Sequence, residues 1–308
     1  MKVTILLLLL WAIYRQLFQQ RNFNELWLNF KTQISPNSIY FIIAALLLLP
    51  INLGIETIKW QKLISKFYKL PFFNAFKAIV LGNTMALFTP NRVGEYIGRV
   101  LYVPQNKIVE TVSATMVGGL SQLIITLLVG LPALILLQLQ LNSGFIENYK
   151  MTLGFTIVVG AITSVFYFKL NWLVVNIKRL NYFKKWLSKI EVVKQFNAFE
   201  LLQVLCLSLF KYLIFTAQFL LLLYAFGLNY SQGNIIAFIA VTFLIQTIIP
   251  SITLLELGVR GNVALMVFGW IGENELTILL ATTVLWMINL MLPALLGSII
   301  LIKKKIVE

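Results

Sequence analysis

The chain has 308 residues, of which 59% are hydrophobic, and it carries a net charge of +14 with no histidine. Its long apolar runs and mean hydropathy of +0.87 exclude a soluble globule and predict an all-α integral membrane protein. The sequence also lacks aspartate, which excludes Ser-His-Asp and Cys-His catalysis, aspartyl-phosphate chemistry and most zinc sites. We therefore expect no enzyme, no catalytic residue, no metal and no cofactor.

The positive charge gathers in the segments between apolar runs. A basic surface that faces anionic lipid explains this better than nucleic acid does, so we expect membrane lipids, with anionic phospholipid headgroups, as the partners. Cys206 is the single cysteine and lies in an apolar run, so no disulfide is expected.

The first half of the chain contains three predicted spans. Val3–Phe18 is interpreted as a retained helix, because no small-residue cleavage site follows it. Ile39–Ile58 is the second span, interrupted at Pro50 and Gly54. Val109–Gln138 is the third, and its segment 118–122 suits close helix packing with interhelical hydrogen bonds from Ser121 and Gln122. A basic loop follows the second span, formed by Lys59, Lys62, Lys66 and Lys69.

Between the second and third spans, Phe73–Val103 predicts a helix that is broken at Pro90. Pro90 lacks an N–H group and cannot continue the helix, whereas Thr89 can cap a new helix that starts there. A broken helix at membrane depth is tolerated only where protein buries it or where it lines a cavity. The second half of this segment is shorter than the roughly 20 residues of a span. We therefore predict a re-entrant hairpin, in which Glu95 and Arg99 share one helix face.

The second half of the chain repeats this plan. Pro250, Glu256 and Arg260 follow Pro90, Glu95 and Arg99 at offsets of 160 or 161 residues. We therefore predict two repeats, 1–150 and 151–308, each with three transmembrane helices and one broken re-entrant hairpin. An odd number of crossings makes the repeats inverted. The predicted elements are the spans Leu153–Phe168, Leu201–Phe226 and Leu276–Ile302, the broken hairpin Ile235–Trp270, and an amphipathic surface helix within Lys169–Lys194.

The distribution of lysine predicts the orientation. With the N-terminus inside, the basic clusters of residues 59–77, 169–194 and 303–305 all lie on the cytoplasmic side. The opposite side holds few basic residues and several glutamates. We therefore expect six spans in a multi-pass protein of the bacterial inner (cell) membrane, with both termini cytoplasmic. The sequence is compatible with a homo-oligomer.

The first broken stretch, with Pro90, Arg92, Gly94, Glu95 and Arg99, resembles the transmembrane domain of lysylphosphatidylglycerol synthases, a family with many stand-alone, flippase-like members. Lys59-Trp60, Pro250 and Leu257-Gly258-Val259-Arg260 extend the resemblance across essentially the whole chain. The chain departs from the family pattern at Gln122 and Gly261, where an acid is usual. We expect no cytosolic aminoacyl-transferase domain, so the resemblance implies movement of a phospholipid or related amphiphile between leaflets, not lipid aminoacylation.

Charged groups at membrane depth cost about 2.5–3.5 kcal/mol unless they find partners or water. One interpretation is structural: Glu95–Arg99 and Glu256–Arg260 lock the two hairpins, and Thr253-x-x-Glu256 forms a capping box. The other is headgroup binding, in which the N–H groups of a helix starting at Pro90 and the planar donors of Arg92 and Arg99 hold a phosphate. Lys211 has no partner in the sequence nearby, so we expect it to extend toward the cytoplasm, with a role as a cavity cation as the alternative. The candidate substrate-binding residues are Thr89, Pro90, Asn91, Arg92, Gly94, Glu95, Arg99, Lys211, Pro250, Glu256, Gly258 and Arg260.

These features favour a lipid flippase that moves a phospholipid or related anionic amphiphile between leaflets by alternating access. Two alternatives remain: a transporter of a small anionic solute, and a non-transporting membrane partner of an envelope-biosynthesis enzyme. A lateral opening would favour lipid, a closed polar cavity would favour a solute, and a solidly packed motif cluster would favour the partner protein.

Overall fold

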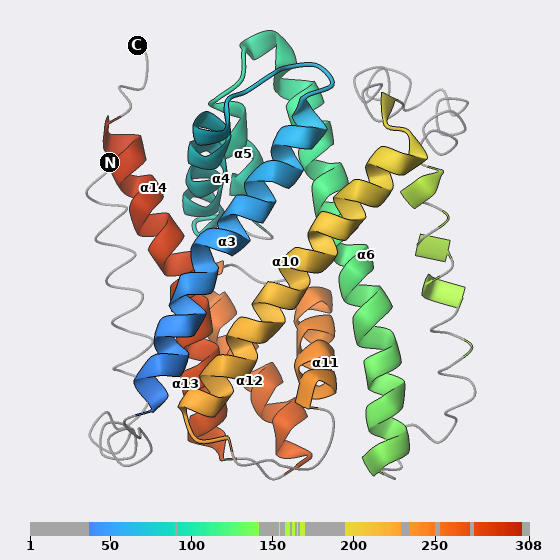
Figure 1. The fold of residues 1–308 in the computed structure, drawn as a ribbon, viewed down its shortest axis with the longest axis vertical. Coiled ribbons are helices and arrows are strands. Elements are labelled where there is room, and N and C mark those ends of the chain that lie inside the picture. The colour runs from blue at the N-terminus through green and yellow to red at the C-terminus, as the bar shows by residue number, and fades with distance from the viewer. Residues whose placement is uncertain are drawn as a thin grey trace.

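The computed structural model describes residues 37–89, 92–141, 195–228, 235–249, 253–271 and 274–303, with scattered residues of 154–169. The predicted span Val3–Phe18 and nearly all of the linker Lys169–Lys194 lie outside these residues. The described part of Leu153–Phe168 is helical. All regular elements of the described residues are helices, as the composition predicts, and Figure 1 shows their arrangement.

Four of the described helices are long and apolar enough to cross a membrane. They are α3 (Ser38–Ile64), α6 (Ile108–Leu141) with the short 3-10 turn before it, α10 (Ala198–Ala225), and the continuous run formed by α13 (Glu275–Trp286), a π-helical segment (Met287–Met291) and α14 (Leu292–Lys303). Each matches a predicted span within a few residues. The protein is therefore a multi-pass membrane protein.

The helix α3 differs from the prediction in two ways. It runs through Pro50 and Gly54 without interruption, because one proline removes a single helical hydrogen bond and its exposed position accommodates the ring. It also continues to Ile64, so Lys59 belongs to the helix and is buried, and the basic loop begins only after Ile64. The predicted loop positions of Lys59 and Lys62 are therefore wrong.

Both predicted breaks are present. The first lies between α4 (Phe72–Ala86) and α5 (Gly94–Val100), and the second between α11 (Ile235–Ile248) and α12 (Thr253–Gly269). At about 1.5 Å per residue, the 15 residues of α4 extend roughly 22 Å, less than the thickness of a bilayer core. In the view of Figure 1, α4 and α5 lie in the upper half and α11 and α12 in the lower half.

Helices of the two halves of the chain pack in a reciprocal pattern. The helix α3 packs along α10, α4 packs against α14, and α11 packs against α6. The two hairpin contacts each use one glycine. A Cβ atom on Gly297 of α14 would meet Val80 and Thr84 of α4, and one on Gly130 of α6 would meet Ala240 and Leu244 of α11. These contacted residues are again 160 positions apart, the offset between the two prolines.

Candidate functional site

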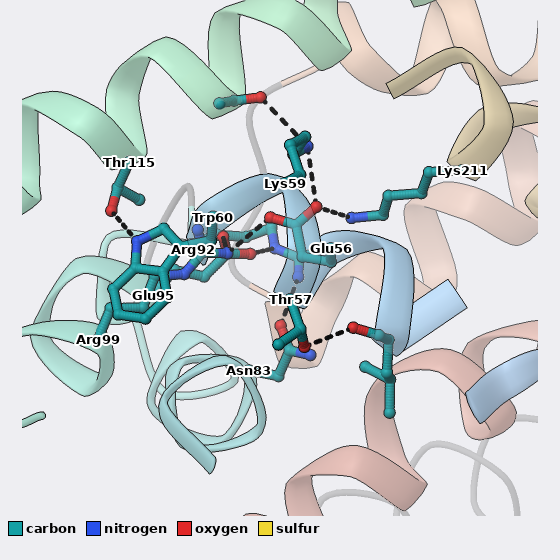
Figure 2. A network of polar contacts seen from close by, with 12 residues as sticks. Glu56, Thr57, Lys59, Trp60, Asn83, Arg92, Glu95, Arg99, Thr115 and Lys211 are labelled. Carbon is teal, nitrogen blue, oxygen red and sulfur yellow. Dashed lines mark hydrogen bonds and ion pairs between the residues drawn. The ribbon is translucent and has the colours of Figure 1, made fainter. Parts of the chain in front are cut away.

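The centre of the site is Glu56 on α3, which sequence reasoning did not single out. Its side chain is 9% exposed, and its carboxylate forms ion pairs with three cationic side chains. Lys59 Nζ lies 2.9 Å and Lys211 Nζ 2.7 Å from Oε2, and Arg99 Nη2 lies 3.0 Å from Oε1. Figure 2 shows these side chains converging from α3, α5 and α10. Glu56 therefore joins residues from both halves of the chain.

A second carboxylate, Glu95 on α5, bridges two arginines. Its Oε2 lies 3.2 Å from Arg99 Nη2, so the predicted pair four residues apart is present. Its Oε1 accepts from Arg92 Nε at 2.5 Å, and Arg92 Nη2 donates to Asn83 Oδ1 at 3.4 Å. Arg99 is 4% exposed and Arg92 is 37% exposed, so Arg92 is the more accessible of the two.

The start of the second half-helix differs from the prediction. The helix α5 begins at Gly94, not at Pro90, and Arg92 precedes it with a left-handed φ of 58°. Its N-cap residue is Val93, which makes no side-chain cap bond, so Thr89 is not the predicted cap, although Thr89 Oγ1 accepts from the N–H of Gly94 at 2.6 Å. The next two amides donate to the carbonyls of Arg92 and Val93. The expected set of free N–H groups for a phosphate is therefore wrong here, and Pro90 and Asn91 lie outside the described residues.

Glycines hold α5 against α4. A Cβ atom on Gly94 would lie 2.1 Å from the carbonyl oxygen of Met85, and one on Gly98 would lie 2.5 Å from the backbone of Gly82. Neither separation leaves room for a side chain, so both positions require the absence of a Cβ atom. Gly94 contributes to packing and does not line the cavity.

The Lys59-Trp60 pair anchors the site to α6. Trp60 is fully buried, and its Nε1 donates to Thr115 Oγ1 at 3.1 Å. Its ring lies 6.0 Å from the guanidinium carbon of Arg99, within the range of a cation–π contact. Lys59 Nζ also donates to the carbonyl of Gly118 at 3.4 Å.

Lys211 on α10 is not a snorkelling lysine. Its ammonium group ends at Glu56, 155 residues away in the sequence, and lines the cavity described below. The interpretation as a cavity cation therefore fits its position, and the expectation that it extends toward the cytoplasm is wrong.

The second hairpin is described less completely. Arg260 on α12 lines the cavity, and its Nη1 lies 3.5 Å from Gln246 Oε1 on α11. Gln246 Nε2 donates back to the carbonyl of Arg260. The side chains of Thr253 and Glu256 and all of Pro250 lie outside the described residues, so the predicted Glu256–Arg260 pair and the capping box stay predictions.

A cavity of about 670 Å³ lies between the two halves. Its charged lining residues are Glu56, Lys59, Arg92, Glu95, Arg99, Lys211 and Arg260. The described lining thus holds five cations and two carboxylates, a net charge of +3. Thr89 and Gly258, both predicted as site residues, are not part of this lining.

Several uncharged polar residues of the lining were not predicted. Asn52 donates to Asn289 Oδ1 at 3.2 Å across α3 and the π-helical segment. Trp286 Nε1 and Gln122 Oε1 are buried without a hydrogen-bond partner. The expected interhelical bond is present for Ser121, which lies 2.7 Å from Ser208 Oγ, whereas Gln122 lines the cavity.

One signal could have found Glu56: an ionisable residue within an apolar span is a candidate functional residue by itself.

Among the described residues no cluster of three or more His, Cys, Asp or Glu side chains could hold a metal ion. The site instead concentrates lysine ammonium and arginine guanidinium groups, which bind phosphate and carboxylate groups. It is therefore suited to binding an anion within the membrane.

The profile of one protein family, described as the lysylphosphatidylglycerol synthase TM region, matches residues 1–297. No curated protein and no solved structure matches the chain. The family match spans all four long helices, both breaks and every described charged residue of the cavity. The chain therefore belongs to the family of lysylphosphatidylglycerol synthase transmembrane regions, and it is a multi-pass membrane protein from a lipid-related family.

Proposed function

We propose that the protein moves an anionic phospholipid, or a related anionic amphiphile, between the leaflets of the bacterial inner membrane. The observation that carries this proposal is the combination of a cationic interior and an apolar, exposed edge in one cavity. Leu123, Ile248 and Ile249 line the cavity with the charged residues, yet they are 38%, 70% and 38% exposed. An amphiphile needs both surfaces, one for its headgroup and one for its acyl chains, whereas a small solute needs only the first.

Arg92 is our candidate for first contact with the headgroup. It is the more exposed arginine of the first hairpin, and its planar guanidinium carries five donor hydrogens. An arginine can hold two phosphate oxygens at once, which the point charge of a lysine does less well. Arg99, deeper and bound by two carboxylates, serves to position the network.

The charge of the lining favours an anionic over a cationic headgroup. A lysylated headgroup would bring ammonium groups, which need free carboxylates. Glu56 and Glu95, the two carboxylates of the described lining, are both already paired with cations. An anionic headgroup meets the opposite situation, because it adds acceptors to a wall with a surplus of donors.

We further propose that the two halves, 1–150 and 151–308, are inverted repeats whose re-entrant hairpins alternate in exposing the cavity to each side. The reciprocal packing of α4 with α14 and of α11 with α6 supports this proposal, as do the opposite positions of the hairpins in Figure 1. The lysines of 62–77 and 303–305 then mark the cytoplasmic side, where both termini would lie.

The test is leaflet exchange of a fluorescent phosphatidylglycerol in proteoliposomes, with Gly119→Phe as the blocking variant. Gly119 lines the cavity on α6, and a Cβ atom there meets no other atom within 4 Å, so the substitution adds bulk at the cavity lining without a clash at the Cβ atom. Gly54→Phe on α3 is the matched control, since Gly54 has equally open surroundings but lies outside the cavity lining.

We expect exchange by wild type and Gly54→Phe, and a loss of most exchange in Gly119→Phe. Equal rates in all three proteins would disprove transport through this cavity. If wild type moves no lipid but takes up a small organic phosphate, the solute transporter replaces the flippase. If it moves neither, a non-transporting role as the partner of another membrane enzyme is favoured.

A further inference from the structure

We infer that the cavity contains a subsite, beside the cationic network, for an uncharged group rich in hydroxyls, as in the headgroup of an inositol or glycosyl phospholipid. This inference rests on the proposed function and names the class of its headgroup. The structural basis is a set of carboxamide side chains from three helices that line the cavity and keep hydrogen-bonding atoms open. They are Asn52 on α3, Asn83 on α4 and Gln122 on α6.

The side chain of Asn52 provides an open acceptor. Asn289 Nδ2 donates to the carbonyl of Leu285 at 3.2 Å, so Asn289 Oδ1 is the atom that accepts from Asn52 Nδ2, also at 3.2 Å. Asn52 Oδ1 is therefore left without a donor among the described residues. It is not one of the fully buried atoms without a partner, so it keeps surface toward the cavity that Asn52 lines. Because Asn52 as a whole is only 5% exposed, a donor for this oxygen must come from the contents of the cavity.

The side chains of Asn83 and Gln122 provide donors. Arg92 can only donate, so Asn83 Oδ1 is its acceptor at 3.4 Å, and Asn83 Nδ2 remains as a donor. Gln122 Oε1 is fully buried, so Nε2 is the end of this half-buried side chain that faces the cavity. The described lining therefore combines an uncharged acceptor with uncharged donors.

A hydroxyl group is the chemical group that matches this combination, because it donates one hydrogen bond and also accepts. The oxygens of an ionised phosphate only accept, so they would leave Asn52 Oδ1 unpaired. An ammonium group cannot accept from Asn83 or Gln122, and it would add a cation beside Lys59 and Lys211. Since the three carboxamides project from three helices, a ring with several hydroxyls can contact more of them than one hydroxyl can.

The subsite lies next to the cationic network. Asn52 and Glu56 are four residues apart on α3, so they share a helix face and are separated by roughly 6 Å along the axis. On α6, Gln122 lies one turn from Gly118, whose carbonyl accepts from Lys59 at 3.4 Å. A phosphate bound by the cations would therefore place the group attached to it beside the carboxamides.

The experiment compares lipids of equal charge that differ in their hydroxyl groups. Full-length protein in nanodiscs of neutral phosphatidylcholine is titrated with short-chain phosphatidylinositol, phosphatidylglycerol and phosphatidylmethanol, which all carry the single negative charge of a phosphodiester. Phosphatidylserine and soluble inositol phosphate are the further probes. Binding is followed by the rise in melting temperature and by Kd. One hydrogen bond between uncharged groups corresponds to about a two- to tenfold change in Kd. With more than one such bond, we expect phosphatidylinositol to bind about tenfold more tightly than phosphatidylmethanol, with phosphatidylglycerol between them.

Two variants remove carboxamides of the subsite. Gln122→Leu should fold like wild type, because it replaces a side chain whose buried Oε1 has no partner. Asn52→Leu removes the open acceptor together with the bond to Asn289. Both variants should reduce the preference for phosphatidylinositol over phosphatidylmethanol. Asn262→Leu is the matched control, since this carboxamide is exposed on α12 and lies outside the cavity lining.

Equal affinity for phosphatidylinositol and phosphatidylmethanol would overturn the inference, even if fluorescent phosphatidylglycerol is transported and the proposed function holds. A preference that Asn262→Leu reduces as much as the two subsite variants would also overturn it. So would tighter binding of phosphatidylserine, which has the same net charge but carries an ammonium group.

Two outcomes would support the subsite and contradict the proposed transport of lipid. The first is a preference for phosphatidylinositol without leaflet exchange of any lipid. The second is stabilisation by soluble inositol phosphate that equals the stabilisation by phosphatidylinositol, which would assign the subsite to a free polyol phosphate.

Discussion

Glu56→Gln is the most informative single substitution for the charge network. The change keeps the size of the side chain and removes the negative charge that Lys59, Arg99 and Lys211 share at 2.7–3.0 Å. Because Lys59 and Arg99 are 2% and 4% exposed, water cannot replace the lost carboxylate. Leaving a buried charge without its partner costs roughly 3–5 kcal/mol, so we expect a loss of stability in that range.

The matched control is Glu110→Gln. Glu110 pairs with Lys107 at 3.2 Å, but the two side chains are 21% and 33% exposed, and such surface pairs contribute only about 0–1 kcal/mol. Stability is measured in nanodiscs without added lipid, as the free energy of unfolding and as the melting temperature. A double variant, Glu56→Gln with Lys211→Gln, should regain part of the loss, because one unpaired cation is removed.

A loss for Glu56→Gln that equals the loss for Glu110→Gln would refute the reasoning, since it would mean that water compensates the three cations. Glu95→Gln is expected to fall between the two. It leaves Arg99 bound to Glu56, and it removes the carboxylate of Arg92, whose exposed guanidinium water can solvate.

Three further predictions address binding, packing and topology. Arg92→Lys should unfold at the wild-type temperature without lipid, but it should lose most of the stabilisation that added lipid gives. Arg99→Lys should instead be less stable than wild type even without lipid. The reverse pattern would exchange the roles given to the two arginines. Gly98→Ala should destabilise the first hairpin by about 1–3 kcal/mol, because its Cβ atom would meet the backbone of Gly82 at 2.5 Å. Gly119→Ala is the control and should be tolerated, since a Cβ atom there meets nothing within 4 Å. Similar unfolding free energies for the two variants would contradict the close contact between α4 and α5. The topology is tested with single cysteines in a Cys206→Ser background and an impermeant external thiol reagent. Cysteines that replace Lys66, Lys185 and Lys304 should be protected on the cytoplasmic side, and cysteines that replace Asn24 and Asn274 should react. Labelling of position 185 would disprove the inverted arrangement.

The sequence predicted the elements of this fold well, because the controlling signals are local. Length and hydropathy define α3, α6, α10 and the last span, and the two Pro-containing stretches coincide with the breaks before α5 and α12. The Glu95–Arg99 pair was predictable for the same reason, since four residues place both side chains on one helix face.

The partners of Glu56 were not predictable, because its contacts join distant parts of the chain. Arg99 and Lys211 lie 43 and 155 positions from Glu56, and no local pattern connects them. The start of α5 at Gly94 was missed because it depends on the close contact of Gly94 with Met85 of α4, a tertiary feature. The π-helical segment around Asn289 likewise has no signature in composition.

The arrangement of Glu56 gives a physical reason for two carboxylates in a cavity that we propose binds an anionic headgroup. Without ligand, Glu56 and Glu95 hold Lys59, Arg92, Arg99 and Lys211 in place and reduce the cost of burying them. On the proposed function, an arriving headgroup competes with Glu56 for Lys211, the 29%-exposed cation contributed by the second half of the chain. If the headgroup replaced Glu56 as the partner of Lys211, the ion pair between α3 and α10 would be lost. The positive net charge of the cavity would decrease at the same time. Binding of the headgroup and release of the two halves would then be the same electrostatic event, which is what alternating access requires of its substrate.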